Sequence, residues 1–174
     1  IIIILVYNNL FSAAPPVDDK PLPPPPYIMN NVNKLNILVE WDSAAVRQYL
    51  PKNFQDLSKL SGGISIFNSK KKQSLSPLSG AYAWIDIDNS KGQKSRLVFY
   101  SIYGKNKLLH KIMSKVYSLE SSKGSSKVTI MNEKINARAN AKSKNVLSIA
   151  AITTEMCKTQ SGTFMFINYK NNNK

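Results

Sequence analysis

The segment Gly80–Asp88 places aromatic and acidic side chains at alternate positions along the chain. In an extended strand Tyr82, Trp84 and Asp86 fall on one side, with alanine and isoleucine side chains on the other. If the aliphatic side packs in the core, the aromatic and acidic side faces either solvent or a cavity. Small-molecule pockets are mostly apolar with a few polar anchors. We therefore expect Tyr82 and Trp84, with Tyr100 from the next predicted strand, to bind a small-molecule ligand.

Histidine and cysteine each occur once, as His110 and Cys157. A Ser-His-Asp triad would have to use His110, which lies inside a predicted amphipathic helix, where we expect a solvated or boundary side chain. One cysteine excludes an intramolecular disulfide, and no Cys/His cluster is present that could hold zinc. Phosphate-binding and dinucleotide-binding glycine motifs are absent. The sequence therefore predicts no metal and no cofactor.

Two helices are expected. Asp42 can cap a short helix that Pro51 ends, and residues 105–117 carry a single apolar stripe. Alternating apolar residues predict strands elsewhere, which together indicate an α+β domain dominated by an antiparallel, barrel-like sheet. The predicted strands cover residues 32–41, 62–67, 80–88, 96–103, 126–132, 134–141, 146–154 and 163–169.

On the predicted helix 105–117, Lys107, Lys111 and Lys115 recur every four residues, away from the apolar stripe. We interpret this helix as a cover for the sheet, with its lysines in water. The alternative is a helix that docks on a membrane surface or a polyanion through these three lysines.

The order of five phrases resembles that of the acetoacetate decarboxylase-like superfamily, over residues 27 to 150. A strand is followed by a capped helix ending in Leu-Pro, then by strands carrying a G-x-Y phrase. The resemblance implies a barrel-like α+β fold with two helices. The phrases are LNILVEW (35–41), DSAAVRQYLP (42–51), GGISIF (62–67), GAYAWIDI (80–87) and LVFYSIYGKNKLLHKIMSKVY (97–117).

In that family a lysine forms a Schiff base with a β-keto acid, and a second cation beside it activates the amine. The family's G-F-P-K-K phrase is matched here by Gly124 and Lys127 alone, so the resemblance implies Lys127 as the nucleophile without its activating neighbour. The alternative, which we favour, is that Lys127 is an ordinary lysine at the start of a strand. The family's glutamate position holds Trp84, and Asp86 on the same face is the candidate replacement, with Glu120 as the other candidate acid or base. Catalysis is therefore expected to be lost or altered.

The formal net charge of +14 is uneven along the chain. Residues 1–87 carry 8 Lys and Arg against 6 Asp and Glu, whereas residues 88–174 carry 16 against 4. The second half is thus the candidate for an acidic partner. Because lysine dominates over arginine, we interpret most of this charge as solvated surface and do not expect specific nucleic-acid binding.

The sequence divides into an apolar segment (1–14), a Pro-rich linker (15–26) and a single domain (27–174). If residues 1–14 are the remnant of a signal peptide, the protein is secreted or periplasmic, and otherwise cytoplasmic. The family domain usually runs longer, and if its closing strands are missing from this sequence, an exposed edge is expected near Phe164–Ile167.

Three functional hypotheses follow from these features. The first is a barrel that binds an apolar or keto-acid-like small molecule. The second is a Schiff-base lyase that uses Lys127, with Asp86 or Glu120 as acid or base. The third is a basic interaction protein that docks on an acidic macromolecule or membrane. A homo-oligomer is compatible with all three.

Overall fold

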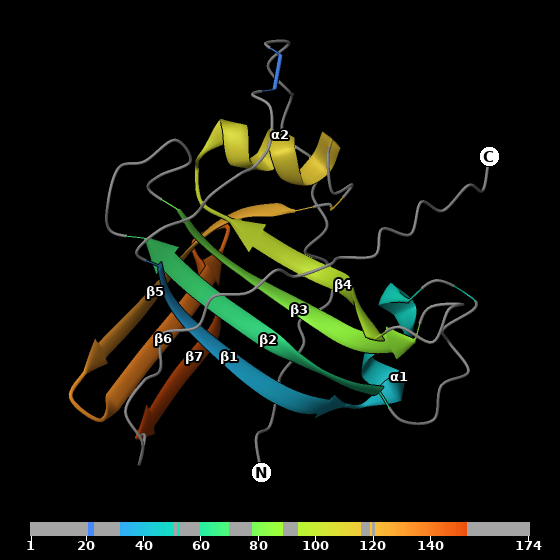
Figure 1. The fold of residues 1–174 in the computed structure, drawn as a ribbon, viewed down its shortest axis with the longest axis horizontal. Coiled ribbons are helices and arrows are strands. Elements are labelled where there is room, and N and C mark those ends of the chain that lie inside the picture. Colours follow the sequence, from blue (N-terminus) through green and yellow to red (C-terminus); the bar gives the residue numbers. More distant parts are fainter. Residues whose placement is uncertain are drawn as a thin grey trace.

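A computed structural model describes residues 21–22, 32–50, 52, 60–69, 78–88, 94–115, 119 and 121–152. Within these residues seven strands form one sheet in chain order, curled into a half-barrel, with a helix across one of its faces (Figure 1). Neighbouring strands are antiparallel except β4 and β5, which are parallel. The elements are β1 (Val32–Trp41), α1 (Ser43–Val46), η1 (Arg47–Tyr49), β2 (Leu60–Ser69), β3 (Ser79–Asp88), β4 (Lys94–Tyr103), α2 (Lys107–Lys115), β5 (Ser122–Met131), β6 (Lys134–Ala141) and β7 (Lys144–Ile152).

This architecture confirms the predicted α+β class with a mainly antiparallel, barrel-like sheet. The predicted strand at residues 32–41 is β1, and the predicted helix at 105–117 appears as the shorter α2. Residues 1–14, most of 15–26 and the predicted strand at 163–169, with its edge at Phe164–Ile167, lie outside the described residues.

Both faces of β2 and β3 are largely buried, and those of β4 are buried in part. The inner face, on the concave side of the curl, packs against β5 and β6, and the outer face packs against α2. The inner cluster consists of Ile64, Ile66, Ala81, Ala83, Ile102, Val128, Ile135, Ala137, Ala139 and Ala141. The outer cluster consists of Phe67, Leu78, Tyr82, Trp84, Tyr103, Leu109 and Ile112.

The helix α1 closes one end of the sheet. Its first turn is capped as the sequence predicts, since the amide of Ala44 donates to Oδ1 of Asp42 at 2.8 Å. Val46 and Leu50 are buried against the ends of β2, β3 and β4. Burial of these apolar side chains fixes the short helix against the sheet.

Hydrogen bonds that involve side chains hold the edge of β5 that does not pair with β6. This strand pairs with β4 only through Ser122 and Lys123, and its remaining edge lies across β1 and β2. The amide of Val128 donates to Oδ1 of Asn68 at 2.5 Å, and its carbonyl accepts from Nδ2 of Asn33 at 3.3 Å. The hydroxyl of Ser126 donates to the carbonyl of Phe67 at 2.6 Å. These bonds hold β5 in place at the point where the curled sheet brings it across β1 and β2.

The side chain of His110 fastens α2 to the turns on both sides of it. Nε2 lies 2.8 Å from the carbonyl of Gly104, so this nitrogen carries the proton, and Nδ1 accepts from the hydroxyl of Ser121 at 2.9 Å. The expectation of a solvated or boundary histidine is wrong, because His110 is only 6% exposed. Burial, with a smaller contribution from the charge of Lys123, lowers the pKa of His110.

Replacing Asn68 by alanine is predicted to lower the free energy of unfolding by about 1–3 kcal/mol, because the amide of Val128 loses its acceptor. Asn68→Asp is the matched control, since a carboxylate oxygen can still accept this bond. Urea unfolding of both variants measures the difference. Equal stability of Asn68→Ala and the parent protein would show that this hydrogen bond does not hold β5 in place.

Folding stability is predicted to decrease as the pH falls through and below about 6.5, the ordinary histidine pKa. The unfolded chain then takes up a proton that buried His110 resists in the folded state, so the unfolded state gains relative stability. In His110→Gln this part of the pH dependence should disappear, which urea titrations between acidic and neutral pH would measure. An unchanged pH dependence in the variant contradicts the assignment.

Candidate functional site

Tyr82 and Trp84 lie on the outer face of β3, beneath α2. Tyr82 is 7% exposed and Trp84 is fully buried, with their ring centroids 5.6 Å apart. Both pack in one cluster with Leu109 and Ile112 of α2. The ammonium of Lys34 donates to the hydroxyl of Tyr82 at 3.4 Å. The side of β3 that the sequence assigned to solvent or a cavity is therefore covered by a helix.

Asp86 belongs to a small network at the edge of this cluster. Its Oδ1 accepts from the indole N–H of Trp84 at 3.1 Å and lies 3.6 Å from Nε of Arg96. The guanidinium of Arg96 lies 4.5 Å from the ring centroid of Trp84. The Asp86 carboxylate thus orients the indole and the guanidinium.

Lys127 is exposed on the side of β5 that faces away from the core, because its neighbours Ser126 and Val128 point inward. Schiff-base chemistry depends on a neutral amine, which burial or an adjacent cation favours. In the described part of the chain, Lys127 and Asp86 make no hydrogen bond or ion pair with each other. The structure does not bring these two candidates together, and Glu120 lies outside the described residues.

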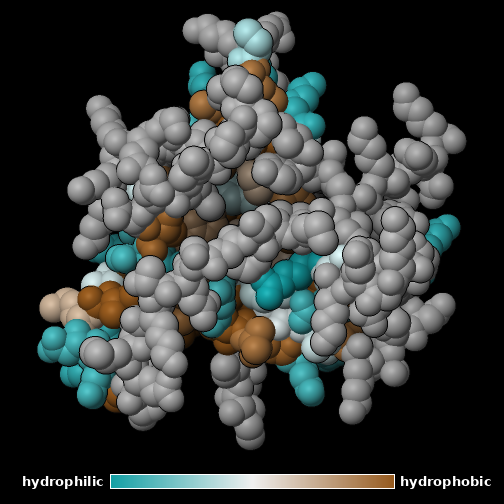
Figure 2. All heavy atoms as spheres, viewed as in Figure 1, coloured by the Kyte–Doolittle hydropathy of each residue, from teal (hydrophilic) through white to brown (hydrophobic). Residues whose placement is uncertain are grey.

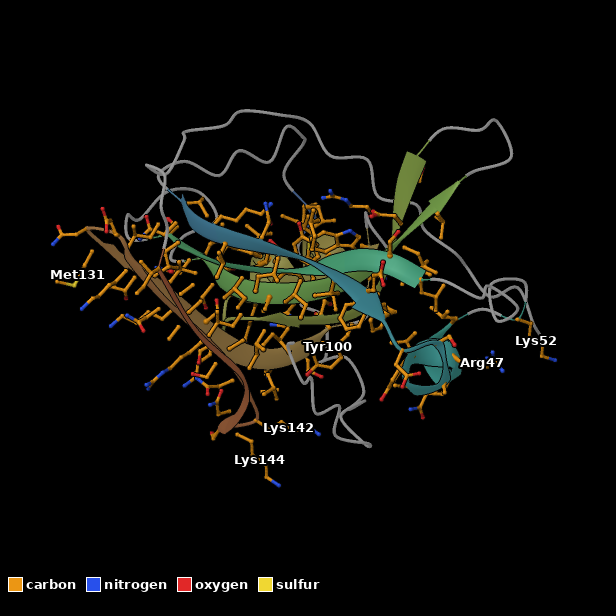
Figure 3. All side chains as sticks on the ribbon, turned by 90° about the horizontal axis from the view of Figure 1, so that it is seen from below. Arg47, Lys52, Tyr100, Met131, Lys142 and Lys144 are labelled. Atoms are coloured by element: carbon orange, nitrogen blue, oxygen red, sulfur yellow. The ribbon has the colours of Figure 1, made fainter. Side chains whose placement is uncertain are left out.

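Tyr100 lies on the opposite, inner face of the sheet, directly across from Ala83. The three predicted ligand-binding rings therefore do not share one wall. The hydroxyl of Tyr100 is buried and has no hydrogen-bond partner among the described residues. Burial, reinforced by nearby Tyr49, raises the pKa of Tyr100. Figure 3 shows Tyr100 on the concave side of the sheet.

An irregularity in β4 places a second ring beside Tyr100. Ala83 pairs with Tyr100 and Trp84 pairs with Val98, so Phe99 is the extra residue of a β-bulge. The ring of Phe99 packs against the inner clusters with Trp41, edge to face at 5.2 Å. Simple alternation would have sent Phe99 and Tyr100 to opposite faces, which is why sequence reasoning missed Phe99.

A glycine next to the bulge lets Trp41 reach across the sheet. The indole N–H of Trp41 donates to the carbonyl of Trp84 at 2.8 Å. A Cβ on Gly62 would lie 2.0 Å from that carbonyl oxygen and 2.8 Å from the indole nitrogen. Tyr49 adds a further ring, stacked on Phe99 at 6.1 Å. The inner face thus combines four aromatic side chains with one hydroxyl that lacks a partner in the described structure.

Two kinds of feature are absent from the residues that the structure describes. No three His, Cys, Asp or Glu side chains gather in a way that could hold a metal ion. None of the helices that the structure describes has the length and apolar character to cross a bilayer.

No protein-family model and no curated protein matches the sequence. Solved structures do match. The acetoacetate decarboxylase of Legionella pneumophila superposes with a TM-score of 0.50 at 8% identity, covering 70% of this chain and 52% of that one. The enduracididine biosynthesis enzyme MppR, complexed with the condensation product of pyruvate and imidazole 4-carboxaldehyde, superposes with a TM-score of 0.52 at 9% identity, covering 75% and 57%.

A further acetoacetate decarboxylase structure matches with a TM-score of 0.51 at 15% identity, covering 71% of this chain and 50% of that one. The chain therefore spans little more than half the length of these structures. At such low identity the likeness concerns the fold and not the chemistry. The seven-stranded half-barrel and its two helices have the acetoacetate decarboxylase-like fold.

Proposed function

We propose that this protein binds a small molecule on the inner face of its half-barrel, with the hydroxyl of Tyr100 as the polar anchor. The observation that carries the proposal is the burial of this hydroxyl without a hydrogen-bond partner among the described residues. A buried hydroxyl in that state costs about 1–3 kcal/mol of stability. A ligand oxygen that accepts its hydrogen bond would recover this cost.

The surroundings of Tyr100 define the chemistry of the ligand. The raised pKa of Tyr100 keeps the phenol protonated at neutral pH, so it acts as a donor and calls for an acceptor such as a carbonyl or carboxylate oxygen. The rings of Trp41, Tyr49 and Phe99 offer an apolar surface for the rest of the ligand. An apolar wall with a single donor is typical of small-molecule sites.

A keto acid or a related apolar carbonyl compound fits this description. The exposed cations Arg47, Lys142 and Lys144 flank the concave side in Figure 3 and favour an anionic ligand. The MppR structure, which carries a product derived from pyruvate, supports the same ligand class by analogy of fold.

The positions of the side chains support binding of the ligand without the Schiff-base reaction. Lys127 faces away from the inner surface, and Trp84, at the family's glutamate position, cannot transfer a proton. Tyr82 and Trp84 serve the packing of α2, which leaves Tyr100 as the ligand-binding candidate on the inner face.

Replacing Tyr100 by phenylalanine tests the anchor. Without ligand, Tyr100→Phe should be as stable as the parent protein or more stable, because the buried hydroxyl is removed. Its affinity for the best ligand in a panel of pyruvate, acetoacetate and longer keto acids should fall roughly 10- to 100-fold, as expected for a lost hydrogen bond to a charged group. Thermal shift and calorimetric titration measure both effects.

The matched control is Tyr82→Phe, which removes the same atom from the opposite face and should leave ligand affinity unchanged. Equal loss in both variants, or none in Tyr100→Phe, would reject the inner face as the site. Borohydride reduction with the same acids separates binding from catalysis. A covalent adduct on Lys127 would establish the lyase hypothesis instead.

A further inference from the structure

The outer face of the three-stranded unit β5–β7 is a basic surface. Alternation along the strands points the small apolar side chains inward and leaves Lys123, Lys127, Lys134 and Arg138 exposed on the other side. We call these four residues the basic face. The exposed side chains between them are short, namely Ser125, Asn136, Ser148 and Ala150.

Like charges lie next to one another on the basic face. Lys127 is paired directly with Arg138 across the ladder, which is unfavourable between neighbouring strands. The amide of Lys142 donates to the carbonyl of Lys123 at 3.3 Å, which brings a further lysine beside the first. None of the four cations forms an ion pair with a described carboxylate. The face thus carries repulsion that an external anion would relieve.

One end of the same face is apolar. In the register of the sheet, Met131 and Ile152 flank Lys134 on the outer side, and they are 68% and 73% exposed. Ile130, 37% exposed, is at this end too. Figure 3 shows Met131 projecting from the tip of the β5–β6 hairpin, and Figure 2 shows apolar and hydrophilic side chains side by side at that end of the molecule.

We propose that the basic face docks on an anionic lipid bilayer. Its cations would contact headgroup phosphates while Met131 and Ile152 enter the boundary between headgroups and acyl chains. Charge complementarity and exposed apolar side chains on one surface together favour lipid. A single-stranded nucleic acid would instead need aromatic rings for base stacking, and the exposed side chains of this face include none.

The helix α2 fits this partner less well, although the sequence suggested it through Lys107, Lys111 and Lys115. Its apolar residues Leu109 and Ile112 are buried against the sheet, so they cannot enter a bilayer while the helix remains packed. The basic face needs no rearrangement to present both charge and apolar side chains.

Cosedimentation of the full chain with phosphatidylcholine vesicles, with and without phosphatidylserine, tests the proposal. Binding should require phosphatidylserine. The triple variant Lys127→Gln, Lys134→Gln and Arg138→Gln should bind roughly 100-fold more weakly, as expected for three cations near an anionic membrane surface. Its melting temperature should equal or exceed that of the parent, since the repulsion between Lys127 and Arg138 is removed.

The matched control is Lys105→Gln, Lys107→Gln and Lys115→Gln, which removes the same charge from exposed positions at α2 and should bind nearly as well as the parent. Replacing Met131 and Ile152 by serine should weaken binding with the charge intact. An equal loss in the two charge variants, or binding to a single-stranded oligonucleotide in place of vesicles, would overturn the proposal.

Discussion

The hydrogen bonds that Asn33, Asn68 and Ser126 make at the free edge of β5 are the contacts on which this structure depends. Only Ser122 and Lys123 of β5 pair with β4. Beyond them this edge of β5 pairs with none of the described strands, so its backbone groups would be buried without partners. The side-chain amides of Asn33 and Asn68 pair with the carbonyl and the N–H of Val128 instead, and the hydroxyl of Ser126 ties β5 to the carbonyl of Phe67. Because β5 is held there, the small apolar side chains of β6 can face the inner surface of β2 and β3, and the sheet closes to a half-barrel.

Each face of the first four strands then has its own role. The outer face is packed by α2, whose position is secured by the two hydrogen bonds of His110. The inner face carries the rings of Trp41, Phe99 and Tyr100, brought together by the β-bulge in β4. The same curvature that buries the alanines of β6 also buries the hydroxyl of Tyr100 on that inner surface, where it has no hydrogen-bond partner among the residues that the structure describes.

The fold resembles that of the acetoacetate decarboxylases, whereas the structure places the candidate catalytic residues Lys127 and Asp86 apart from each other. The outward direction of Lys127 follows from the alternation of side chains along β5. Ser126 points inward and bonds to the carbonyl of Phe67, so the next side chain points outward. Trp84 fills space beneath α2 and is oriented by Asp86. In this structure Trp84 therefore has a packing role and Lys127 a surface position, and the fold by itself assigns neither of them a chemical role.

The sequence by itself determined where the seven described strands lie along the chain. Alternation in β1, the cap at Asp42 and the antiparallel pairing of β3 with β4 follow from local signals, and each appears in the structure. It also predicted that Tyr82 and Trp84 share one side of β3. It could not show what covers that side, because a period of two looks the same whether a face meets a helix, solvent or a ligand.

Only the tertiary structure decided the remaining points. The bulge that sends Phe99 and Tyr100 to one face, the burial of His110 and the outward direction of Lys127 depend on pairings between segments distant in sequence. The partners of Asn68 lie 60 residues along the chain, at a strand edge that no local pattern identifies. Such contacts arise only when the sheet curls and brings side chains of β1 and β2 to buried backbone groups of β5.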